Sequence, residues 1–154
     1  MRVDLSEQCI VNANAQFWEQ MLAMRLDPIC FPEEFCVCAG HLLGSVHLSG
    51  GWKGRIEVRM AEGLAQLATA AMLMQPVEMV GGADTLDATK EIANMIAGVI
   101  KSSLPRPCVM TVPESAVESK GFCSRSRTED SLVVAFRHAA GDLMVRVWEH
   151  EYPQ

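Results

Sequence analysis

One long helical stretch, closed at both ends by helix-breaking residues, most constrains how this chain can fold. The pair Gly81-Gly82 breaks the chain before the stretch, and Pro105 and Pro107 follow it, so that a helix is predicted from about Asp84 to about residue 103. Apolar side chains recur along it at helical spacing and form one arc: Ala88, Ile92, Met95, Ile96, Val99 and Ile100. The pattern predicts a helix with one face buried and the opposite face polar.

Two shorter helices and several strands account for most of the remaining chain. Helical spacing predicts a first helix over 12–26, ended by Pro28 and Pro32, and an Ala- and Leu-rich second helix over 61–74. Alternating patterns predict strands over 34–41, 43–49, 53–60, 108–112, 118–124, 130–138 and 142–149. Because helices and strands come in blocks, we expect an α+β fold. Its sheet would be mixed but mostly antiparallel, with three helices packed on one face and two helix-then-strands halves.

Length and charge narrow the class of protein. The 154 residues suit one domain, over 1–154, with a substantial core. Thirteen basic against nineteen acidic residues give a net charge of −6, which argues against a nucleic-acid partner. The start of the chain lacks the apolar region of a signal peptide, and its most apolar stretch, residues 64–74, is too short to cross a bilayer. We therefore expect a cytoplasmic protein with no membrane association.

The cysteines and histidines do not form a recognisable metal-binding pattern. Cys36 and Cys38 stand one residue apart in a predicted strand, so that they point to the same face, but no second close pair completes a zinc site. We expect the six cysteines to be scattered buried thiols in a reducing compartment. The four histidines lack ligand spacing and are expected to be ordinary strand or surface residues. No metal site is predicted.

The polar face of the long helix carries the candidate functional residues. Asp87, Glu91 and Asn94 stand at positions i, i+4 and i+7, and at about 100° per residue they fall in one stripe that Gly98 and Lys101 continue. A carboxylate and a carboxamide one turn apart can hold a partner and position a water molecule. The plainer interpretation is a solvated helix face on which Glu91 pairs with a lysine, either Lys90 or Lys101.

A faint internal repeat accompanies this helix. When residues 17–24 are aligned with residues 89–96, Glu19 matches Glu91, but Leu22 stands where the second copy has Asn94. The alignment suggests two similar halves, of which only one carries the polar pair.

The run Asp87-x3-Glu91-x2-Asn94, continued to Gly98, resembles the signature of the CheC, CheX and FliY family of chemotaxis phosphatases. In that family a proline follows the Asn after some eighteen to twenty residues, and here Pro113 stands nineteen residues after Asn94. Residues 49–56 resemble the glycine-rich hairpin of the same family. Members similar to CheC carry two Glu-x-x-Asn helices and members similar to CheX carry one, so this chain resembles the single-site CheX-like branch.

The resemblance implies an activity and a partner. The activity would be hydrolysis of the aspartyl phosphate on a CheY-type response regulator, with Asn94 orienting the attacking water. Glu91 would contact a lysine at the regulator's phosphorylation site, and Asp87, Gly98 and Lys101 are candidates for further partner contacts. The partner would supply Mg²⁺ and the phosphoaspartate, so that this chain needs no cofactor of its own.

Some roles have two interpretations. Asp87 is expected to stabilise the helix N-terminus rather than to contact the partner. Gly98 would allow a neighbouring chain to approach or would serve helix packing, and Pro113 would shape a strand end. The resemblance also implies a homodimer, to which the alternating strand 143–148 could contribute if it lies at a sheet edge.

Two other functions fit the same sequence. The first is a non-catalytic CheX-like domain that docks a response regulator or a flagellar switch component. The second is an unrelated α+β domain that binds a small ligand or simply assembles. The presence of both Glu91 and Asn94 favours the enzyme over the non-catalytic domain, whereas the unrelated domain would show no activity and no phosphorylation-dependent partner.

Overall fold

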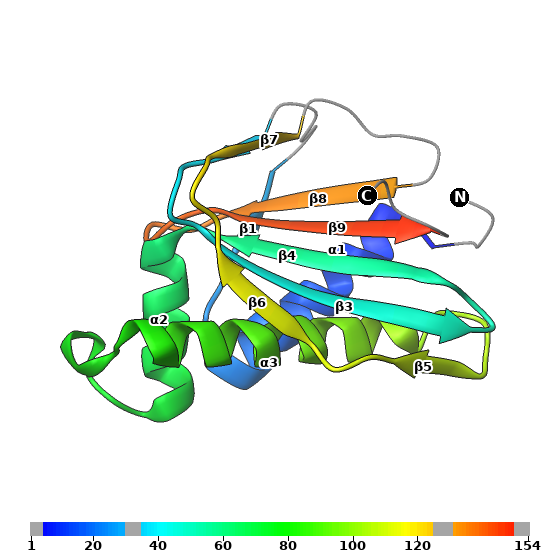
Figure 1. Cartoon of the computed structure of the whole chain (residues 1–154), viewed down its shortest axis with the longest axis horizontal. Coiled ribbons are helices and arrows are strands. Elements are labelled where there is room, and N and C mark those ends of the chain that lie inside the picture. Colours follow the sequence, from blue (N-terminus) through cyan, green and yellow to red (C-terminus); the bar gives the residue numbers. More distant parts are fainter. Residues whose placement is uncertain (1–4, 30–34, 125–130, 150–154) are drawn as a thin grey trace.

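The computed structural model describes residues 5–29, 35–124 and 131–149. Within these ranges a seven-stranded sheet has the order β1-β8-β9-β4-β3-β5, and β6 also pairs with β3 (Figure 1). Every pairing in this sheet is antiparallel. Its strands are β1 (Asp27–Pro28), β3 (Leu42–Gly50), β4 (Gly54–Met60), β5 (Cys108–Met110), β6 (Glu114–Val117), β8 (Ser131–Arg137) and β9 (Leu143–Glu149).

The helices lie on one face of the sheet (Figure 1). They are α1 (Glu7–Ala15), which continues as the π-helical segment η1 (Gln16–Met21), then α2 (Glu62–Leu73) and α3 (Gly82–Lys101), with a short 3-10 turn η2 (Val77–Met79) between the last two. The α+β prediction, with three helices on one face of an antiparallel sheet, is confirmed. So is the long third helix, which begins two residues before the predicted start.

The two halves of the chain pack helices and strands in a corresponding way. The first half consists of α1 followed by β3 and β4, and the second of α3 followed by β8 and β9. The central strands β4 and β9 pair with each other, and β3 and β8 flank them. Helix α1 packs against β8, whereas α3 packs against β3. Each of these two helices thus covers a strand of the other half, which agrees with the predicted organisation in two halves.

The core fills the space between the helices and the sheet. Alternate residues of β4, Ile56, Val58 and Met60, face the helices and are fully buried. Ile92 and Ile96 of α3 are buried with them, as the apolar arc of this helix predicts. This packing fixes which side of α3 faces solvent.

Gly44 allows α3 to lie unusually close to β3. A Cβ atom at this position would stand 2.8 Å from the carbonyl oxygen of Thr89 and 2.9 Å from the Cβ of Ala93. Both distances are too short for ordinary contact, so any side chain here would push the helix away from the strand.

Replacing Gly44 by alanine should therefore destabilise the fold by about 2 kcal/mol, the usual size of an overpacking penalty. Urea unfolding measures the effect. Gly82→Ala is the matched control because a Cβ there would meet no atom within 4 Å, and it should leave stability unchanged or slightly raised. Equal unfolding midpoints for Gly44→Ala and the wild type would contradict the close approach.

The predicted bounds of the first helix, 12–26, are wrong at both ends. The helix begins at Glu7, because the side chain of Ser6 accepts a hydrogen bond from the backbone N–H of Cys9 and caps it. It ends before the prolines, since Leu22 caps the π-helical segment and the next residue, Ala23, adopts a left-handed φ of 52°. Pro28 lies instead in β1.

Two predicted strands are also different in the structure. Only β2 (Phe35–Val37) forms within the predicted strand 34–41. Within the predicted strand 118–124 only β7 (Phe122–Ser124) forms, and the preceding strand β6 (Glu114–Val117) was not predicted. β2 and β7 pair with each other in a separate two-stranded ribbon over the outer face of the sheet (Figure 1). Strand 143–148 was expected to be either an edge or an inner strand, and it is inner, because β9 lies between β8 and β4.

The expectation of scattered buried thiols is wrong for the ribbon. Cys36 is exposed and disulfide-bonded, and Cys38 is an exposed free thiol. Cys9 is half-buried and Cys108 is buried, and both are free, as expected. Among the described residues no group of three or more His, Cys, Asp or Glu side chains could hold a metal ion. Cys30 and the side chain of Cys123 lie outside the described part.

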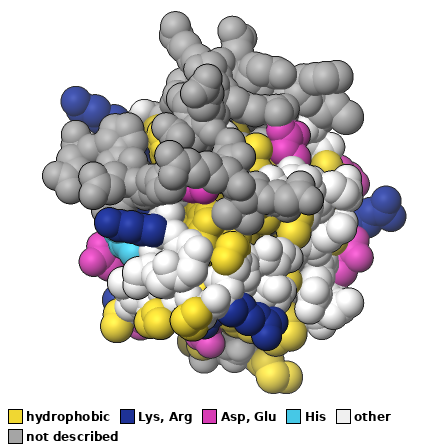
Figure 2. Space-filling view, turned by 90° about the vertical axis from the view of Figure 1, so that its right-hand side faces the viewer, with side chains coloured by type: hydrophobic (Ala, Val, Ile, Leu, Met, Phe, Trp, Pro, Cys, Tyr) yellow, Lys and Arg dark blue, Asp and Glu magenta, His cyan; other side chains and the backbone are white. Residues whose placement is uncertain are grey.

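Charges of both signs are mixed on the side of the molecule that carries the β5 end. Figure 2 shows Lys and Arg side chains interspersed with Asp and Glu there. Within the described ranges, no helix is both long enough and apolar enough to span a membrane.

Candidate active site

Helix α3 presents the predicted polar stripe to solvent. Its first turn is fixed by Asp84, whose carboxylate accepts a hydrogen bond from the backbone N–H of Gly81 at 3.0 Å. Further along, Asp87 and Glu91 are exposed and Asn94 is half-buried. In a regular helix the Cβ atoms of Glu91 and Asn94 lie roughly 5–6 Å apart, so one small group can contact both side chains.

Glu91 and Asn94 have no partner within the described part of the chain. Neither side chain forms a hydrogen bond or an ion pair there, and the same holds for Asp87. The pairing of Glu91 with Lys90 or Lys101 is thus not observed. Lys101 in particular is ten residues away, which is about 15 Å along the helix axis. A carboxylate and a carboxamide therefore stand together with their hydrogen-bonding capacity available to another molecule.

A hollow of about 490 Å³ lies beside this stripe, between α3, α2 and η1. Asp84, Asp87 and Glu91 line its acidic side. Its remaining wall is apolar and is formed by Phe17, Met21, Leu22, Ala71, Met72, Leu73, Met74, Ala88 and Met95. The stripe therefore borders a concave apolar surface on one side.

Gly98 and Lys101 lie apart from this hollow, toward the C-terminal end of α3. They line a second hollow of about 480 Å³ together with Arg106 and Cys108. A Cβ atom at Gly98 would meet nothing within 4 Å, so Gly98 serves no helix packing within the described residues, and that expectation is wrong. The alternative role, close approach of another molecule, stays a prediction.

The expectation that Asp87 stabilises the helix N-terminus is also wrong. The helix begins at Gly82, so Asp87 lies in its second turn, and Asp84 provides the capping carboxylate. Asp87 is free to serve a partner. Pro113 directly precedes β6, in agreement with its expected role at a strand end.

On the first helix, the residues that correspond to Glu91 and Asn94 are Glu19 and Leu22, so this helix has no side-chain amide at the second position. Glu19 is exposed on η1, and Leu22 lies half-buried against the acidic hollow. The first helix thus adds apolar surface to the hollow instead of a second polar pair.

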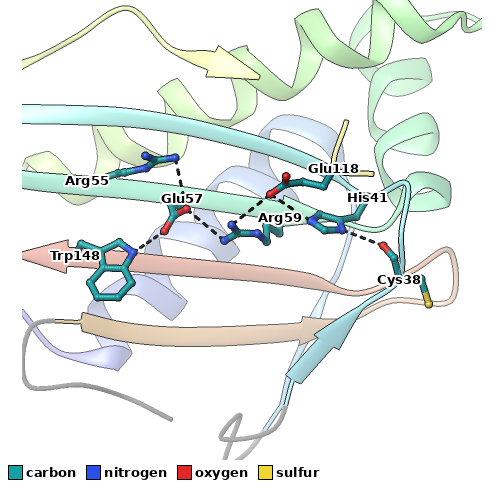
Figure 3. A network of polar contacts seen from close by, with 7 residues as sticks. All are labelled: Cys38, His41, Arg55, Glu57, Arg59, Glu118 and Trp148. Atoms are coloured by element: carbon teal, nitrogen blue, oxygen red, sulfur yellow. Dashed lines mark hydrogen bonds and ion pairs between the residues drawn. The ribbon is translucent and has the colours of Figure 1, made fainter. Parts of the chain in front are cut away.

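A charged cluster on the outer face of the sheet is the main polar feature that sequence analysis missed (Figure 3). Glu57 and Arg59 of β4 are only 7% and 6% exposed. The Glu57 carboxylate lies 3.3 Å from the guanidinium of Arg59 and 3.6 Å from that of Arg55, and it accepts a hydrogen bond from the indole of Trp148. The alternation of charged and apolar residues in strand 53–60 indicated the outward direction of these side chains but not their burial.

The cluster connects the ribbon and the loop after β6 to the sheet. Arg59 reaches Glu118 at 3.5 Å, and its guanidinium lies 3.8 Å from the centre of the Phe122 ring. The Nδ1–H of His41 donates a hydrogen bond to the backbone carbonyl oxygen of Cys38, at 2.9 Å. These contacts stabilise the fold on the face opposite α3.

Burial also affects two neighbouring bases. It lowers the pKa of Arg146, although the negative charge of Glu57 acts in the opposite direction and raises that pKa. Burial and the charge of Arg55 lower the pKa of His47 as well. The cluster is therefore a structural ion network, at a distance from the polar stripe.

Replacing Glu57 by glutamine should reduce the free energy of unfolding by about 2 kcal/mol, because buried guanidinium groups lose their counter-charge. Thermal unfolding of the variant checks this. Glu78→Gln, a change of an exposed carboxylate on η2, is the control and should have no measurable effect. An unchanged melting temperature for Glu57→Gln would show that the network does not stabilise the fold.

The fold and the site together define a class of protein: an α+β domain with two related halves and a single Glu-x-x-Asn pair on an exposed helix. The family model described as "Chemotaxis phosphatase CheX" matches residues 42–137, more than half of the chain. The chain belongs to this CheX family.

Solved structures of chemotaxis proteins have the same fold. The chemotaxis protein CheX from Vibrio vulnificus is 20% identical with a TM-score of 0.75, covering 97% of this chain and 99% of that chain. A CheC-like superfamily protein from Shewanella sp. PV-4 is 18% identical with a TM-score of 0.75, covering 98% and 100%. CheX from Borrelia burgdorferi, solved as a complex with CheY, BeF3 and Mg²⁺, is 16% identical with a TM-score of 0.72, covering 97% and 100%. No curated protein matches the chain by sequence.

Proposed function

We propose that this protein accelerates hydrolysis of the aspartyl phosphate on a CheY-type response regulator in chemotaxis signalling. The observation that carries the proposal is the pair Glu91 and Asn94, one helical turn apart on the solvent-facing side of α3 and without a hydrogen-bond or ion-pair partner in the described part of the chain. Membership of the chemotaxis phosphatase CheX family supports it.

Asn94 would act by position. In the reaction a water oxygen forms a bond to phosphorus while the bond from phosphorus to the aspartyl oxygen breaks, which releases phosphate and the free carboxylate. The carboxamide both donates and accepts hydrogen bonds, so it can hold the water in line with the breaking bond. It is too weak a base to take the water's proton, so its contribution is orientation.

Glu91 would anchor the regulator. Its exposed carboxylate can form an ion pair with a lysine beside the phosphorylation site, one helical turn from Asn94. Asp87 stands on the same exposed face and can add a second acidic contact. Gly98 and Lys101 would meet the regulator further along the helix.

The regulator would bring the metal and the phosphoryl group. Mg²⁺ neutralises phosphoryl charge in such reactions, and here it would be held by the acidic residues of the partner. We propose that this chain uses no cofactor of its own.

We also propose a homodimer in the cytoplasm. Because β9 is an inner strand, a dimer would use another surface, and the edge strands β5 and β6 expose Val109 and Val117. A cytoplasmic location would expose the Cys36 disulfide to reducing thiols. Sedimentation and thiol labelling of protein taken directly from cells test these two proposals.

The decisive experiment follows the decay of a phosphorylated CheY-type regulator from the same genome with and without this protein. Faster decay supports the phosphatase. Binding that depends on beryllofluoride activation of the regulator, without faster decay, would instead establish the non-catalytic docking domain. Neither effect with any regulator of that genome would overturn both.

A further inference from the structure

Exposed apolar side chains gather beside the candidate active site. Six of the nine large hydrophobic side chains that are exposed in the described structure lie on η1, on α2 or on the connection from α2 to α3: Met21, Leu67, Leu73, Met74, Val77 and Met79. The other three lie on or near β5 and β6, at a different place in the fold. Such a gathering on one side of a small domain marks a contact surface.

Met74 stands at the centre of this surface. Its side chain is 92% exposed, and it lines both the acidic hollow and a neighbouring apolar hollow of about 480 Å³. Met74 ends α2 with a left-handed φ of 54°, a position where glycine or asparagine is common. A methionine there directs a large flexible apolar group into solvent.

The charge of the acidic hollow selects the partner. Asp84, Asp87 and Glu91 line it, and no Lys, Arg or His is among the described residues around it. Asp87 and Glu91 have no partner in the described chain. A segment that fills the hollow must therefore bring apolar side chains and a positive charge together.

We propose that the acidic hollow docks the segment of the response regulator next to its phosphorylation site. Apolar side chains of that segment would pack on the methionines of the hollow, and a basic side chain would lie at its acidic rim. The inference rests on the proposed function, because Glu91 belongs both to the hollow and to the polar stripe. Methionines suit such a surface because their flexible side chains adapt to different apolar partners. The hollow sets affinity for the regulator, whereas Asn94 sets the rate once it is bound.

The test is Met74→Lys, which replaces exposed apolar surface by a charge of the sign that the basic segment carries. The change should raise KM for the phosphorylated regulator about tenfold and leave kcat at saturation unchanged. Met21→Lys, 60% exposed on the opposite wall, should act in the same direction. Val112→Lys is the matched control: it is 83% exposed in the connection between β5 and β6, away from the hollow, and should leave KM unchanged.

The outcomes separate this inference from the proposed function. An active enzyme whose KM is unaffected by both methionine changes overturns the docking surface and leaves the phosphatase standing. A second outcome is that the wild type binds the beryllofluoride-activated regulator but does not accelerate decay of the phosphorylated one, and that Met74→Lys abolishes this binding. That outcome supports the docking surface and overturns the phosphatase. If Met74→Lys instead dissociates an oligomer of this chain while KM stays constant, a second copy occupies the hollow and the inference is wrong.

Discussion

Asn94→Ala should reduce the rate of regulator dephosphorylation by a factor of 10² or more, which corresponds to about 3 kcal/mol of transition-state stabilisation. The loss arises because no other side chain would hold the attacking water in line. Asn94 forms no hydrogen bond or ion pair within the described chain, so its replacement by alanine should leave the fold intact.

Single-turnover decay of the phosphorylated regulator at saturating protein measures this effect, with circular dichroism to verify the fold. Asn12→Ala is the matched control, because it removes an exposed amide from α1 and should preserve the rate. A fully active, folded Asn94→Ala variant would show that the water is oriented elsewhere.

Glu91→Ala should lower kcat/KM by roughly 30-fold or more, which corresponds to about 2 kcal/mol, because a basic group of the regulator loses its carboxylate partner. Much of the loss should appear as a higher KM, since the ion pair forms on binding. Glu91→Gln should behave similarly, which separates charge from side-chain volume.

The affinity for beryllofluoride-activated regulator, measured at low and high salt, checks this prediction. The wild type should lose affinity as salt increases, and the Glu91 variants should depend less on salt. Glu19→Ala removes the corresponding exposed carboxylate of the first helix and serves as control. Equal losses from Glu19→Ala and Glu91→Ala would contradict the assignment of the site to α3 alone.

The sequence predicted most accurately what depends on local pattern. The apolar arc of α3, with Ile92 and Ile96, gave the helix, its buried face and hence the exposure of Glu91. The hairpin of β3 and β4 was equally clear, because glycines mark the turn and apolar residues alternate in the strand. Element type followed from periodicity and turn chemistry.

What depends on distant contacts was not predictable in the same way. The ribbon of β2 and β7 joins segments more than eighty residues apart, and the burial of Glu57 and Arg59 depends on it and on the surrounding loops. The capping role of Asp84 rather than Asp87 was missed because the helix bound was wrong by two residues. The hollow beside the stripe needed three helices in place, since Met21, Met74 and Glu91 come from separate elements.

Under the proposed function, the presence of Leu22 where α3 has Asn94 would limit how many regulators one chain can serve. With one polar pair, each chain would process a single regulator at a time, and titration should saturate at one regulator per chain. A homodimer of such chains would be bivalent only through two separate α3 surfaces. Its two sites would then be identical, so that binding at both should follow one affinity unless the first regulator hinders the second.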